Sequence, residues 1–384
     1  MVVAITQLPV INYPQFDAQN VLTQVTEARK NLKNTDVDSW LERIAVKLEY
    51  SALMLASAGT QEFYTYSEKL YGKPTDPFVD GKSTPLELAN SFDKQIKSYG
   101  SYDLGAPLPT CNLASDIAAQ MKTAVDTMFG DEAPDIQIVD QLSANALANP
   151  KLIRIRRSAC FTDRDAQQLI SHEAHIHVAT SINGLNQSNL KILAAGHPGT
   201  TKTQEGLAVF SEYISGSIDL DRLRILADRI LAIQMAIEGA DFLDVYQFFL
   251  DRIHNESQAF ENSRRVFRGG ALTGGGPFTK DGVYLEGLIR VHNFLKAAAS
   301  NGRADCLRLL FCGKLDIEDV PVIYKLEKMG LCKPAKYLPP WAKDARYLLA
   351  YLTCSAFLNK MDVSKIYEHY DDLLHSIPKT THAD

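Results

Sequence analysis

Residues 171–180, Ser-His-Glu-Ala-His-Ile-His-Val-Ala-Thr, gather three of the chain's nine histidines beside a glutamate on an otherwise apolar stretch. Upstream, Thr162 and Asp165 have the spacing of a helix-capping box, with Asp in place of the usual Glu or Gln. Apolar residues at 166, 169 and 170 follow with helical spacing. The segment therefore predicts a helix that carries imidazoles and a carboxylate together.

The spacing of these histidines limits the geometry of the helix. A zinc-peptidase helix presents two imidazoles on one face and a carboxylate beside them, usually as H-E-x-x-H. Here residue 176 is Ile, so His172 and His177 lie five positions apart, which is about 140° around a regular α-helix. Sharing one metal requires a widened i→i+5 turn. The alternative pair, His172 and His175, needs no widened turn but places Glu173 less well as a general base.

A third ligand is expected downstream, and His197, Glu205 and Glu212 are the candidates. Residues 200–216 predict a helix that begins with capping threonines, has Glu205 in its first turn, and approaches the histidine helix closely at Gly206. Glu212 lies on the same face as Glu205 and could orient a ligand histidine. Glu205 could instead complement the helix dipole. His197, in a loop, is expected at the surface or near substrate.

The remaining pattern predicts a mostly α-helical α+β protein with a small sheet beside the histidine helix. Two short strands are expected at 136–139 and 152–157. A soft boundary near residue 130 divides an N-terminal helical region, 1–130, from a zincin-like catalytic region, 131–384. Expected helices, besides 163–180, cover residues 20–34, 38–58, from 85 onward, 113–129, 203–216, 219–239, 241–255, 281–299, 303–312, 316–329 and 343–359.

Composition excludes several classes of protein. A net charge of −6 over 384 residues gives no basic field for nucleic acid. No apolar run reaches the ~20 residues of a membrane-spanning helix, and the N-terminus lacks a basic signal-peptide region. Six cysteines without C-x-x-C spacing fit reduced thiols. A cytoplasmic protein is expected, while its oligomeric state is left open.

A glycine-rich basic segment at 264–284 offers groups for binding a substrate. It lacks the G-K-[S/T] of a phosphate-binding loop. An exopeptidase needs a cation for the terminal carboxylate and a donor for the developing oxyanion. Arg268 or Lys280 is the candidate carboxylate clamp and Tyr284 the candidate oxyanion donor. The alternative is a solvated basic loop with a buried tyrosine, and the first two arginines of the segment are expected to be structural.

Several motifs along the chain resemble the QEGLA-motif family, whose bacterial members are often labelled flavohemoglobin expression-modulating proteins. Microtubule-associated tyrosine carboxypeptidases belong to the same family. The similarity extends over roughly residues 40 to 360. The matching motifs are QEGLA at 204–208, HEAHIH at 172–177, EFYTYSEKLYGKP at 62–74, STPLELA at 83–89 and RRVFRGG…FTKDGVYLEG at 264–287.

The resemblance implies a zinc peptidase in which His172, His177 and Glu205 hold one Zn²⁺ and Glu173 is the catalytic base. It also implies a mostly helical fold with a small sheet by the site. The substrate would be a peptide or protein C-terminus, from which one residue is released, an aromatic residue being one option. Tubulin recognition does not carry over, because tubulin-directed members have additional segments and nothing in this sequence marks such a partner.

Two other functions compete with a zinc carboxypeptidase. A non-catalytic or regulatory metal-binding protein is the main alternative, although a degenerate site normally loses its base first and Glu173 is present. An aminopeptidase would need grouped acidic residues to hold a free amine, and no such group lies near the histidine helix in the sequence. The hydrolase is therefore the favoured hypothesis.

Overall fold

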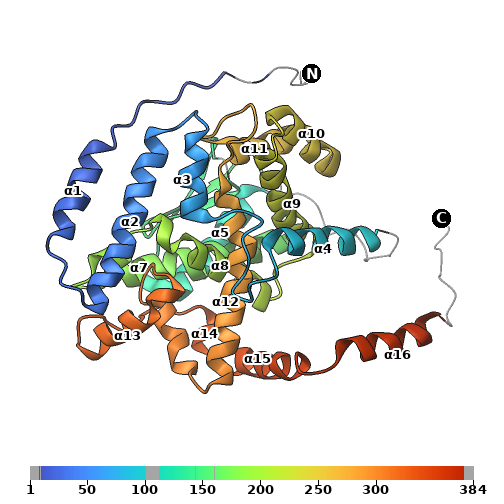
Figure 1. The fold of residues 1–384 in the computed structure, drawn as a ribbon. Coiled ribbons are helices and arrows are strands. Elements are labelled where there is room, and N and C mark those ends of the chain that lie inside the picture. The colour runs from blue at the N-terminus through green and yellow to red at the C-terminus, as the bar shows by residue number, and fades with distance from the viewer. Residues whose placement is uncertain (1–7, 9, 101–111, 143, 160, 376–384) are drawn as a thin grey trace.

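Helices dominate the architecture, and one small sheet lies among them (Figure 1). The structure is a computed structural model and describes residues 8, 10–100, 112–142, 144–159 and 161–375. No helix in these ranges combines the length and apolar character needed to cross a bilayer. Within them, four cysteines are free thiols: Cys306, Cys312, Cys332 and Cys354. The predicted thiols of Cys111 and Cys160 lie outside the described residues.

The N-terminal third is helical, as its periodicity predicts. Thr35 and Thr84 each cap a helix through a capping box, with Asp38 and Glu87 as the reciprocal partners. Helix α3 was not predicted as a separate element, although its buried residues Phe63, Ser67, Leu70 and Tyr71 recur at helical spacing. The helices are α1 (Gln19–Arg29), α2 (Asp36–Ala56), α3 (Glu62–Tyr71), α4 (Pro85–Ser98), α5 (Ala114–Phe129) and the short 3₁₀ helix η1 (Gly130–Glu132).

A three-stranded sheet follows, in the order β1-β3-β2. The two predicted strands, β1 (Asp135–Val139) and β3 (Leu152–Arg156), pair in parallel. The third strand, β2 (Ala146–Ala148), pairs antiparallel with β3 and was not predicted, because three residues are too few to show an alternating pattern. Ile153 and Ile155 of β3 are fully buried in an apolar cluster shared with α5 and the histidine helix.

The histidine helix and the next two helices form the centre of the molecule. The relevant elements are α6 (Asp163–Leu169), η2 (Ile170–Val178), α7 (Ala179–Leu185), the 3₁₀ turn η3 (Lys191–Ala194), α8 (Pro198–Ile214) and α9 (Leu220–Ile237). Helix α8 begins at Pro198, earlier than predicted, because His197 and not a threonine precedes its first residue. Glu205 therefore lies in the helix interior, and the expected first-turn position is wrong.

The C-terminal part is helical again, with α12 passing alongside α8 (Figure 1). Residues 304–311, predicted as an α-helix, form a 3₁₀ helix instead. Helices α11 and α16 were not predicted, and α16 extends away from the body of the molecule. The elements are α10 (Phe242–Ile253), α11 (Glu256–Phe267), η4 (Thr279–Gly282), α12 (Val283–Ser300), η5 (Ala304–Phe311), η6 (Ile317–Asp319), α13 (Val320–Lys328), α14 (Pro340–Lys343), α15 (Arg346–Leu358) and α16 (Val363–His375).

Glycines set the distance between the two central helices. A Cβ on Gly206 of α8 would lie 2.3 Å from the carbonyl oxygen of Gly287 in α12. Gly206 thus allows α8 to approach α12, and the expectation that it faces the histidine helix is wrong. The largest apolar cluster joins α2, α3, α8 and α12, with Trp40 and Phe210 among its fully buried side chains. The division near residue 130 stays a prediction.

Candidate metal centre

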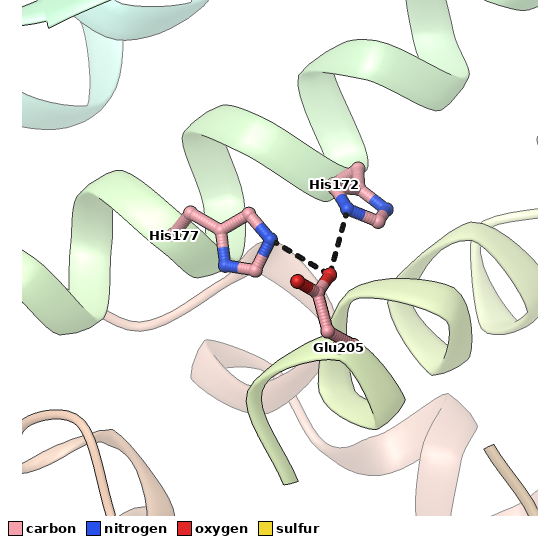
Figure 2. A group of neighbouring side chains, drawn as sticks. All are labelled: His172, His177 and Glu205. Atoms are coloured by element: carbon pink, nitrogen blue, oxygen red, sulfur yellow. Dashed lines mark ion pairs between the residues drawn. The ribbon is translucent and has the colours of Figure 1, made fainter. Parts of the chain in front are cut away.

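The histidine segment forms a π-helix from Ile170 to Val178, which continues α6 and leads into α7. Thr162 and Asp165 form the capping box that starts α6. The wider π turn is what a five-residue histidine spacing needs. It brings the ring centroids of His172 and His177 to 4.9 Å (Figure 2).

Glu205 of α8 reaches across to both histidines (Figure 2). Its Oε2 lies 3.5 Å from Nε2 of His172 and 3.3 Å from Nε2 of His177. One possible ligand atom from each of the three residues lies within 4.8 Å of the other two. In the described part of the chain, this is the one group of three or more His, Cys, Asp or Glu side chains found with such spacing. Oε2 is buried and lacks a hydrogen-bond partner. Two imidazole nitrogens and an unsatisfied carboxylate oxygen thus point at one place.

Glu212 holds His172 from the opposite side. Nδ1 of His172 donates to Oε1 of Glu212 at 2.7 Å, which directs Nε2 towards Glu205. Arg222 of α9 donates to both oxygens of Glu212 at 2.9 Å each. Burial opposes ionisation of Glu212, yet Arg222 and His172 lower its pKa to about 2. Sequence reasoning identified Glu212 as an orienting residue but missed Arg222, which lies ten positions beyond it.

The charged groups of this centre shift one another's pKa values strongly. Burial opposes a proton on His172, yet Glu205 and Glu212 raise its pKa to about 10. Burial likewise opposes charge on Glu205, but Lys280, His177 and His172 lower its pKa well below the ordinary value. These groups attract positive charge, and a cation bound between them would displace the proton.

Glu173 is buried beside His172 on the π-helix. Within the described residues its carboxylate makes no hydrogen bond or ion pair. Lys314, in the segment between η5 and η6, lies near the carboxylates of Glu173 and Glu205. Burial lowers the pKa of Lys314, while Glu205 and Glu173 raise it. No local motif marks this lysine, because it is distant from the histidine segment in sequence.

Only some of the predicted substrate-binding residues lie close to the candidate metal centre. The ring of Tyr284 stacks on that of His172, with 6.3 Å between the ring centroids. Nζ of Lys280 lies 3.6 Å from Oε1 of Glu205 and 5.7 Å from the Tyr284 ring centroid. Arg268 is exposed, with its guanidinium over Phe278. The structure therefore brings Tyr284 and Lys280 to the centre, and directs Arg268 to another aromatic ring.

The two remaining candidate histidines are outside the ligand group. His197 precedes the first residue of α8, and its Nδ1 is buried without a partner. His175 is partly buried, and burial lowers its pKa to about 4. Neither side chain contributes a ligand atom to the group formed by His172, His177 and Glu205.

The fold and this cluster define a mostly helical α+β protein with a centre suited to a single cation. A comparison with family models matches residues 3–360 to the microtubule-associated tyrosine carboxypeptidases. The chain belongs to this family, which implies a carboxypeptidase-like hydrolase acting on a peptide or protein. A comparison with curated proteins returned no match.

Proposed function

We propose that this protein is a zinc-dependent carboxypeptidase with a zincin-like core. Its family supports the carboxypeptidase class. The zinc assignment rests chiefly on one observation, the buried Oε2 of Glu205, which has no hydrogen-bond partner and faces the Nε2 atoms of two histidines. A buried carboxylate oxygen without a hydrogen bond is costly, so a cation at this point would satisfy it.

The donor set suits zinc better than the harder divalent cations. Two imidazoles and one carboxylate match a catalytic zinc site, whereas Mg²⁺ and Ca²⁺ prefer oxygen ligands. His172, His177 and Glu205 would hold the ion and leave a position open. When bound, zinc supplies Lewis-acid chemistry and lowers the pKa of water.

The protein's own groups take the remaining roles. Glu173, unpaired and buried beside His172, accepts the proton of the attacking water and delivers it to the leaving amine. Tyr284 donates a hydrogen bond to the oxyanion as the carbonyl is attacked. Of the two predicted clamp residues, Lys280 lies beside Glu205 and supplies positive charge for the terminal carboxylate, whereas Arg268 is exposed over Phe278.

The substrate would be a peptide or protein C-terminus. Since the family is named for tyrosine removal, a peptide with a C-terminal aromatic residue is the first substrate to test. Tubulin is the corresponding protein substrate to examine, as a separate question. A cytoplasmic location would give access to such substrates.

The decisive test is incubation of zinc-loaded protein with a peptide library of varied C-termini, followed by mass spectrometry. We expect loss of single C-terminal residues. Glu173→Gln should retain stoichiometric zinc and lower kcat by at least about 100-fold, because only the general base is removed. Internal cleavage would indicate an endopeptidase. No cleavage by zinc-loaded wild type would favour the non-catalytic metal-binding alternative.

A further inference from the structure

Four basic side chains from three segments surround Tyr284, next to the proposed metal ligands. Two lie on α9, one on α11 and one on η4. They are Arg222, Arg229, Arg265 and Lys280. Such a concentration of partly buried cations is costly unless each has a carboxylate partner.

Two of the arginines are fully paired. Arg222 donates to both oxygens of Glu212 at 2.9 Å. Arg265 donates to both oxygens of Asp281 at 2.6 and 2.9 Å. These bidentate pairs have the preferred geometry of guanidinium and carboxylate. Neither arginine can therefore form a second bidentate pair with a substrate carboxylate.

Arg229 lacks a comparable partner. Its Nε is buried and makes no hydrogen bond, and the nearest carboxylate oxygen, Oδ2 of Asp281, is 3.8 Å away and already bound by Arg265. The guanidinium carbon lies 5.2 Å from the centroid of the Tyr284 ring. Because that ring also stacks on His172, Arg229 is one side chain away from the metal ligands.

The cluster has one more cation than it has carboxylates. Glu205, Glu212 and Asp281 face the four basic groups. Binding of a metal to Glu205 would weaken that carboxylate's hold on Lys280. An incoming anion would therefore meet two underused cations, Arg229 and Lys280.

We propose that Arg229, assisted by Lys280, binds the terminal carboxylate of the substrate. The proposal rests on the proposed carboxypeptidase function and adds the residue that recognises a free C-terminus. An arginine fork suits a carboxylate better than a lysine point charge does. Burial, followed by the charge of Arg265, lowers the pKa of Arg229 to about 10, which agrees with a cation short of negative charge.

Two other cations are weaker candidates for this role. Arg268 is exposed and stacks over Phe278. Lys314 is near the centre but acts on Glu173 and Glu205, so a substrate carboxylate placed there would meet two like charges. Both residues therefore provide matched control variants.

Binding measurements on an inactive variant separate recognition of the free C-terminus from its hydrolysis. Zinc-loaded Glu173→Gln protein is titrated with a peptide selected from the library and with its C-terminal amide, by calorimetry. We expect the free acid to bind at least about 30-fold more tightly, because the amide leaves buried cations unpaired. Arg229→Gln in this background should bring the ratio close to one, Arg229→Lys should preserve part of it, and Arg268→Gln and Lys314→Gln should leave it unchanged.

The same variants in the active protein connect binding to catalysis. For the free acid, Arg229→Gln should lower kcat/KM by about 30- to 1000-fold, with little further change for the amide. Zinc content and melting temperature verify each variant, and if Arg229→Gln does not fold, Arg229→Lys provides the comparison. An unchanged acid-to-amide ratio in a folded Arg229 variant would overturn the proposal, as would its loss in Lys314→Gln alone. Equal rates for both peptides in wild type would instead refute the carboxypeptidase function.

Discussion

His172 lies between two carboxylates, and each of its nitrogens has a separate task. Nδ1 donates to Glu212 at 2.7 Å, whereas Nε2 faces Oε2 of Glu205 at 3.5 Å. The short bond to Glu212 selects the tautomer whose Nε2 lone pair is available to a metal. Arg222 keeps Glu212 ionised and in position. The orientation of one proposed ligand thus depends on a chain of three residues.

The two neighbouring histidines offer a direct test of the ligand assignment. His177→Ala should weaken zinc binding by at least about 100-fold, since losing even a supporting partner of a ligand costs 10- to 100-fold. His175→Ala should change it by less than about threefold, because His175 is outside the ligand group. Competition with a chromophoric chelator measures both affinities. Similar losses in the two variants would contradict the assignment.

At the scale of elements, the site depends on how α8 is held. Helix α8 contacts the π-helix η2 and α12. The contact with α12 is close because glycines meet, with Gly206 opposite Gly287. Glu205 directly precedes Gly206 in the chain, so the helix crossing also determines where the carboxylate ligand lies.

Adding one methyl group at this crossing should destabilise the protein. In Gly206→Ala the new Cβ would lie 2.3 Å from the backbone oxygen of Gly287, so the helices must separate. We expect a loss of about 1–3 kcal/mol in the free energy of unfolding, together with weaker zinc binding. Gly282→Ala is the control, because its Cβ would meet only Ile230 at 3.6 Å. Urea unfolding compares the two, and an equally stable Gly206→Ala protein would show that the crossing is not tight.

A second contact between elements should be sensitive to pH. Arg252 of α10 donates to Asp228 of α9 and to Asp93 of α4, each at 2.7 Å. Burial raises the pKa of Asp228 from 3.8 to about 6, although Arg252 opposes the shift. The folded protein therefore holds this proton more tightly than the unfolded chain does. The contribution of Asp228 to the free energy of unfolding is fully present below about pH 4. It is lost as the pH rises through about 6.

Replacing Asp228 should remove this pH dependence. Between pH 4 and 7, Asp228→Asn should gain of the order of 2–3 kcal/mol in the free energy of unfolding relative to wild type. Urea unfolding of metal-free protein at both pH values gives the difference. Asp251→Asn, an exposed position on α10, is the control and should follow wild type. If the free energies of unfolding of Asp228→Asn and wild type differed by the same amount at both pH values, the prediction would be contradicted.

At the scale of the whole molecule, one apolar cluster extends over helices from both ends of the chain. Trp40 of α2 belongs to the same cluster as Phe210 of α8 and Leu352 of α15. A second cluster joins α5, the sheet and the histidine helix. The proposed metal ligands lie where the two clusters meet, since Glu205 is on α8 of the first cluster and the histidines are on η2, which packs into both. A bound cation would therefore add a further link between the two clusters.

Removing zinc should consequently lower the stability of the entire protein. A ligand that binds only the folded state adds about 2.7 kcal/mol when present at 100 times its dissociation constant. We expect the melting temperature of zinc-loaded protein to fall by at least about 3 °C after chelation, and to recover when zinc is restored. His177→Ala should show no zinc-dependent change. A melting temperature unaffected by chelation in wild type would argue against a stably bound ion.

Local patterns in the sequence predicted a large part of this molecule. Capping residues and apolar spacing identified most of the long helices, and β-branched residues identified β1 and β3. Strand β2 was missed because three residues show no pattern, whereas α3, α11 and α16 were missed although their sequences are amphipathic. The family was recognised correctly, because its motifs are contiguous stretches of the chain.

Only the tertiary structure decided how distant residues meet. The histidine spacing required a widened turn, but the protein's packing determined that η2 lies against α8 and that Glu205 reaches both imidazoles. Arg222, Arg229 and Lys314 could not be singled out, because their importance depends on which charges surround them once buried. Sequence determines the local conformation and the types of chemical groups. The environment that tunes those groups is created by contacts between segments far apart in the chain.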